Sequence, residues 1–117
     1  MRIAAVFVFL SLAQAVSIAG TWRATINVTN GSFAQIFTFH TAGKTFTGTM
    51  VNGSRGTEPL SDIVVQGSQI HFDWIEEMEG RKMDWKYAGT VHANEMDLTL
   101  TMPMGGKTLH LIAKRGR

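Results

Sequence analysis

Residues 69–91 read QIHFDWIEEMEGRKMDWKYAGTV, and this stretch decides the fold. Large apolar side chains alternate with polar ones on both sides of a Glu-Gly turn signal, which is the pattern of two strands joined by a hairpin. A turn centred on this signal pairs Trp74 with Trp85 and Phe72 with Tyr87. Because paired residues in a hairpin face the same side of the sheet, the stretch predicts an antiparallel hairpin with one aromatic face.

The same alternation continues in both directions from this hairpin. It predicts eight strands, at residues 20–28, 33–41, 45–51, 61–65, 69–77, 82–91, 95–102 and 108–115. Turns centred at residues 30–31, 42–43, 67–68, 93–94 and 105–106 predict the pairs Trp22–Phe39, Ala24–Phe37, Phe39–Phe46, Val65–Ile70, Ile63–Phe72, Val91–Met96, Tyr87–Leu100, Leu100–Leu111 and Leu98–Ala113. Gly48 is expected opposite Phe37, and Gly89 opposite both Ile70 and Leu98, where a missing side chain makes room for a bulky neighbour. The prediction is an all-β fold, an eight-stranded antiparallel up-and-down meander closed into a small barrel.

The other face of each predicted strand is polar and rich in threonine. Asp73 falls opposite Lys86 on this face and is expected to form a surface ion pair. The agreement between the turn signals and the two faces is the strongest structural signal in the sequence.

Composition limits the function classes. The chain has 117 residues, 44% hydrophobic and 17% charged, which fits one folded domain. It has no cysteine, so disulfides, thiol nucleophiles and cysteine-ligated metals are excluded. The formal net charge is +2 and the basic residues are scattered, so no nucleic-acid partner is expected.

Residues 1–19 have the layout of a secretory signal peptide, which leaves residues 20–117 as a single domain. Arg2 precedes an apolar run at residues 3–12, and small residues at Ala13-Gln14-Ala15 and Ser17-Ile18-Ala19 provide two cleavage sites. An uncleaved anchor is the alternative, but the run is shorter than the roughly 20 apolar residues that span a membrane. We expect a secreted or periplasmic monomer with no membrane span after removal of the leader.

The first predicted strand opens with Gly20-Thr21-Trp22, and the chain resembles the lipocalins and other calycins, which begin with Gly-x-Trp. Residues 46–49 and 87–91 resemble strand motifs of small exported bacterial domains. The Thr-Asp-Tyr motif and the flanking helix of true lipocalins are missing, so the resemblance is to a calycin-like barrel. It implies that Trp22 plugs the closed end of the barrel, that Arg115 packs across it, and that the interior binds small apolar ligands.

Catalytic and metal-binding patterns are weak, so neither an enzyme nor a cofactor is predicted. Three histidines share the outward face but lie on strands that are not neighbours in a meander: His40, His71 and His110. The serines lie in or beside turns, and none is in a Gly-x-Ser-x-Gly motif. The acidic residues Glu76, Glu77 and Glu79 are interpreted as a charged hairpin tip exposed to solvent.

The interior leaves two interpretations open, a cavity for a small apolar ligand or a core filled by its own side chains. The residues predicted to bind a ligand are Phe33, Gln35, Phe37, Met50, Phe72, Trp74, Trp85, Tyr87, Met96 and Leu100. No interior arginine is expected near Tyr87, which disfavours a carboxylate ligand. In the filled alternative, the protein acts as a structural or interaction module through the loops at residues 51–59 and 76–82.

Overall fold

A computed structural model describes residues 17–116, which form one antiparallel sheet and contain no helix. The strands are β1 Gly20–Val28, β2 Gly31–Ala42, β3 Thr45–Asn52, β4 Thr57–Pro59, β5 Ser61–Gln66, β6 Gln69–Met78, β7 Arg81–His92, β8 Glu95–Thr101 and β9 Thr108–Arg115. Residues 1–16, the greater part of the predicted leader, lie outside the described residues. The predicted all-β antiparallel class is confirmed.

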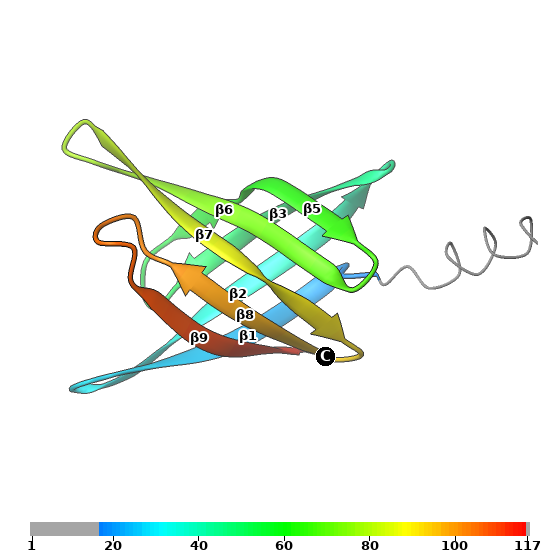
Figure 1. Ribbon diagram of the computed structural model, residues 1–117, viewed down its shortest axis with the longest axis horizontal. Coiled ribbons are helices and arrows are strands. Elements are labelled where there is room, and N and C mark those ends of the chain that lie inside the picture. Colours follow the sequence, from blue (N-terminus) through cyan, green and yellow to red (C-terminus); the bar gives the residue numbers. More distant parts are fainter. Residues whose placement is uncertain (1–16, 117) are drawn as a thin grey trace, which may run out of the picture.

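The sheet order is β4-β3-β2-β1-β9-β8-β7-β6-β5, so consecutive strands pair except β4 and β5, and β1 pairs with β9. The sheet curls around its apolar face until β3 lies in contact with β5 (Figure 1). A backbone hydrogen bond of 2.9 Å from Leu60 N to Gly48 O joins the two sides where the chain passes from β4 to β5. Over residues 17–116 no ladder of hydrogen bonds closes the circle, so β4 and β5 remain the edge strands.

The concave face of the sheet holds the core, as the alternating pattern predicts. The largest fully buried side chains come from β1, β2, β3, β6, β7 and β8 and from the segment before β1: Trp22, Tyr87, Phe37, Phe39, Phe72, Ile18, Met50, Met96, Leu98 and Val91. Phe72 stacks on Tyr87 at 4.8 Å between ring centroids, and Phe37 meets both rings edge-on. Such contacts add about 0.5–1.5 kcal/mol per pair beyond the burial of apolar area.

The number of strands differs from the prediction by one. Strand β4 lies inside the segment that the sequence marks as a loop, and Thr57–Pro59 pairs with β3. It is three residues long, shows no apolar alternation and ends in a proline, which is tolerated only at a sheet edge. A strand held by backbone pairing alone leaves no periodic signal in the sequence.

Three hairpins have the predicted register, and three are shifted by two residues. The pairs Val65–Ile70, Trp74–Trp85, Phe72–Tyr87, Val91–Met96 and Tyr87–Leu100, and the two partners of Gly89, are confirmed. The other partners are wrong: the structure pairs Trp22 with Phe37, Ala24 with Gln35, Thr41 with Phe46, Phe39 with Gly48, Leu100 with Leu109 and Leu98 with Leu111. A turn placed one residue from its true centre moves every partner by two positions, and this leaves each side chain on its predicted face.

The pair Ile63–Phe72 is also wrong, because the register shifts between Ser61 and Val64. Asp62 lies in this bulge at a φ of 52°, a left-handed conformation that aspartate adopts more readily than most residues. The extra residue lets β5 bend where the sheet curls toward β3.

One end of the curled sheet is plugged by Trp22. The guanidinium of Arg115 lies 4.2 Å from the centre of the Trp22 ring, which confirms that these two side chains meet. The indole Nε1 of Trp22 donates a hydrogen bond of 2.9 Å to the carbonyl of Ile18, and Ile18 is fully buried. Arg115 also donates to the carbonyls of Ala19 and Ser17, so the segment before β1 belongs to this closed end.

Candidate functional site

The end of the sheet opposite Trp22 contains a pocket of about 350 Å³. It lies where β1, β3, β6 and β8 finish and β2, β7 and β9 begin, near the β1–β2 and β6–β7 hairpin turns (Figure 1). The lining residues are Ile26, Asn27, Val28, Phe33, Gln35, Asn52, Arg55, Trp74, Glu76, Trp85, Leu100, Met102 and Leu109. Small-ligand pockets are mostly apolar clefts of about 300–1,000 Å³ with a few polar groups, and this pocket is at the small end of that range.

Two tryptophans form one wall of the pocket. Trp74 and Trp85 are directly paired across β6 and β7, and their rings stack at 5.4 Å between centroids with an angle of 26°. The side chains alternate along each strand, so both rings project to the concave face. Trp74 is 3% exposed, and its Nε1 has no hydrogen-bond partner.

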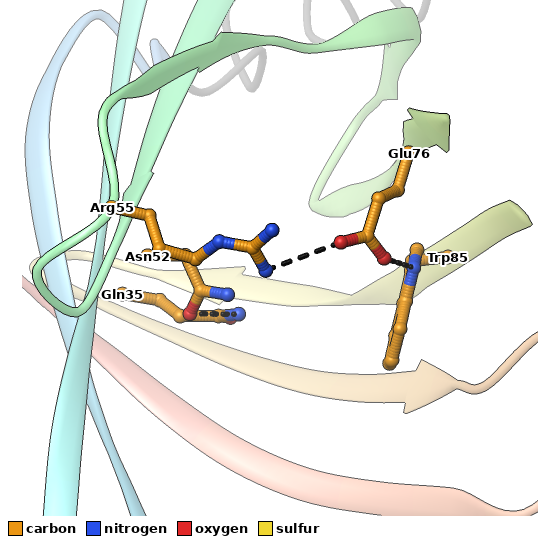
Figure 2. Close-up of polar contacts among 5 residues, drawn as sticks. All are labelled: Gln35, Asn52, Arg55, Glu76 and Trp85. Carbon is orange, nitrogen blue, oxygen red and sulfur yellow. Dashed lines mark hydrogen bonds and ion pairs between the residues drawn. The ribbon is translucent and has the colours of Figure 1, made fainter. Parts of the chain in front are cut away.

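The carboxylate of Glu76 is held inside the pocket. Glu76 is only 7% exposed, and each of its oxygens accepts one hydrogen bond. Trp85 Nε1 donates to Oε1 at 3.0 Å, and the Arg55 guanidinium donates to Oε2 at 3.1 Å. Figure 2 shows Arg55 extending from the loop after β3 toward Glu76, with the Trp85 indole on the other side of the carboxylate. A buried charge requires such a partner, because an unpaired carboxylate in an apolar site is strongly disfavoured.

A second polar chain links the buried core to the pocket, where Gln35 and Asn52 are part of the lining. The hydroxyl of Tyr87 donates to Gln35 Oε1 at 2.9 Å, and Gln35 Nε2 donates to Asn52 Oδ1 at 3.2 Å. Burial raises the pKa of Tyr87 well above its usual value, so its hydroxyl stays protonated and donates. These bonds satisfy the buried amide of Gln35.

The ten predicted ligand residues fall into two groups. Phe33, Gln35, Trp74, Trp85 and Leu100 line the pocket. Phe37, Met50, Phe72, Tyr87 and Met96 lie outside its lining and pack in the buried core. The interior is thus filled over most of its length and hollow at one end, which combines the two interpretations that the sequence left open.

Sequence reasoning missed the two charged residues of the pocket. Glu76 was expected in solvent at the hairpin tip, yet it has the same parity as Phe72 and Trp74 and therefore points inward. That parity was visible in the sequence. Arg55 lines the pocket, and no periodic signal marks it because it lies in the loop between β3 and β4.

The outward face carries ion pairs, and Asp73 and Lys86 line a hollow of about 520 Å³ there. Lys86 lies opposite Asp73 as predicted, at 3.4 Å, and also pairs with Asp84 at 3.0 Å. His110 contacts Asp97 on the exposed side of β8 and β9. Over residues 17–116, no three histidine, aspartate or glutamate side chains gather closely enough to hold a metal ion.

Within this same part of the chain, no helix has the length and apolar character to cross a membrane. Comparison with protein-family models, with characterised proteins and with solved structures finds no match to this chain.

Proposed function

We propose that this protein is an exported, calycin-like module that binds a small, mainly apolar molecule in the pocket at the open end of its sheet. The observation that carries the proposal is the contrast between the two ends of the interior. One end is sealed by Trp22 and Arg115, and the other holds a pocket of about 350 Å³ walled by stacked tryptophans. A protein that needed only a stable core has no requirement for this hollow, because each unfilled volume in a core costs packing energy.

The arrangement at the closed end supports the calycin-like assignment and favours one of the two cleavage sites. The Gly-x-Trp motif supplies a tryptophan covered by an arginine from the last strand. Of the two cleavage sites, the one after Ala15 retains Ser17–Ala19, whose carbonyls accept hydrogen bonds from Trp22 and Arg115. We therefore propose that processing occurs after Ala15. In this proposal the mature protein acts outside the cytoplasm as a monomeric binding protein without catalysis.

A titration of tryptophan fluorescence with 1-octanol tests the proposal. Trp74 and Trp85 line the pocket, so a ligand that enters it changes their emission in a saturable way. Leu109→Phe narrows the pocket and weakens binding. Ile112→Phe, on the exposed face of the same strand, is the matched control and leaves binding unchanged. If 1-octanol and similar apolar molecules produce no saturable change, the protein acts instead as a filled interaction module through its loops.

A further inference from the structure

Resting on the proposed function, the inference concerns the charge of the ligand. We infer that the pocket selects an organic cation, an amine on a small apolar body, and that Arg55 occupies the position of the ligand's positive charge when the pocket is empty. The juxtaposition that carries this inference is a buried carboxylate, two stacked indoles and an exposed arginine at one pocket.

The carboxylate of Glu76 is the permanent part of this site. It is 7% exposed and sits on β6, where its inward direction is set by the alternation of the strand. Its neutral partner, Trp85 Nε1, comes from the adjacent strand and is equally fixed. Because Glu76 is buried, a positive partner beside its carboxylate is favourable.

Arg55, in contrast, is the replaceable part of the site. Its side chain is 59% exposed and extends from a loop, and its backbone is held there by a turn hydrogen bond of 3.1 Å to Asn52. An arginine that is already mostly in water loses little when it swings out, because exposed ion pairs contribute little to stability. The incoming cation then restores the charge balance of Glu76 from inside the pocket.

The stacked indoles complete a site for a cation on an apolar body. Trp74 and Trp85 line the same pocket, and the N–H edge of Trp85 is held 3.0 Å from the carboxylate. An ammonium group bonded to Glu76 therefore lies inside the pocket, where the apolar body of the ligand packs against the indoles. A carboxylate ligand would compete with Glu76 for Arg55 and would leave like charges together in an apolar pocket, which is unfavourable.

The test compares three molecules that share one chain and differ in head group: octylamine, 1-octanol and octanoate. Dissociation constants are measured on the wild-type protein by tryptophan fluorescence and checked by calorimetry. We expect octylamine to bind at least about tenfold more tightly than 1-octanol, and octanoate to bind most weakly. Binding of 1-octanol with no preference for octylamine, or tightest binding of octanoate, overturns the inference but leaves the proposed function intact. Failure of all three to bind overturns both.

Two variants separate charge selection from simple affinity for the apolar chain. Glu76→Gln keeps the shape and is expected to bring the octylamine affinity down to that of 1-octanol, whereas Glu77→Gln, on the exposed face one residue away, leaves the preference intact. Arg55→Gln removes the internal competitor and is expected to strengthen octylamine binding. Weaker octylamine binding in Arg55→Gln overturns the inference. This second test stands even if Glu76→Gln fails to fold.

Discussion

Residues 17–19, just before β1, are expected to stabilise the closed end, and removal of residues 16–19 tests how that end is held. Two chains are compared, one of residues 16–117 and one of residues 20–117. The shorter chain lacks Ile18, which is fully buried, and lacks the carbonyl that accepts the Trp22 Nε1 hydrogen bond of 2.9 Å. Both losses act on the same buried plug.

The magnitude follows from these two terms. Burial of a whole isoleucine side chain contributes about 1.5–3 kcal/mol. A buried donor left without its acceptor costs about 1–3 kcal/mol. The expected loss in the free energy of unfolding is therefore about 2.5–6 kcal/mol, a large share of the roughly 5–15 kcal/mol that a domain has in total. Arg115 also loses its bonds to the carbonyls of Ser17 and Ala19, which acts in the same direction.

Urea denaturation followed by circular dichroism measures the difference between the two chains. Ile18→Ala in the longer chain is the matched control, because it removes the side chain and keeps the carbonyl. Its loss is expected to be smaller than that of the truncation, and the difference reports the hydrogen bonds that Trp22 and Arg115 donate to the carbonyls of residues 17–19. If the free energy of unfolding of residues 20–117 lies within about 1 kcal/mol of that of the longer chain, burial and hydrogen bonding at this end do not contribute as the structure implies.

Two further predictions concern the sheet. In Gly89→Ala, the new Cβ would clash with the main-chain oxygen of Asp97 in β8, so we expect a loss of about 3 kcal/mol or more in the free energy of unfolding measured in urea. Gly56→Ala, with no atom within 4 Å of its new Cβ, is expected to change little. Equal stability of the two variants would show that β7 and β8 are not packed this closely. Burial and the neighbouring Asp84 raise the pKa of the Asp73 carboxyl above its usual 3.8. The folded protein therefore binds the proton of Asp73 more tightly than the unfolded chain does. It loses stability as the pH rises from the unfolded pKa through the folded one. Asp73→Asn is therefore expected to be more stable than the wild type at pH 7, by less than about 1 kcal/mol, and equally stable at pH 3; an advantage that grows on acidification would contradict this.

Much of the candidate site was within reach of the sequence, because the face of a strand is a local property. The pairing of Trp74 with Trp85 follows from the alternation and from one turn signal, and the structure confirms it. The same parity places Glu76 inside, although its acidic neighbours suggested a solvated tip. Strand alternation placed Glu76 inside, whereas its acidic neighbours placed it in solvent. Alternation was the better predictor because it follows from the geometry of the strand.

What the sequence determined alone is therefore the two faces of the sheet and the residues that share the interior. Alternation has a period of two, so an error of one residue in a turn centre still leaves Trp22 and Phe37 on the correct face. The tertiary structure alone decided which residues are partners in three hairpins, that β3 and β5 meet, and which end of the interior stays hollow. Arg55 shows the reason most directly: it reaches Glu76 across 21 residues of chain from a loop without periodicity. Such a contact depends on how the whole sheet curls, and no local pattern records that curvature.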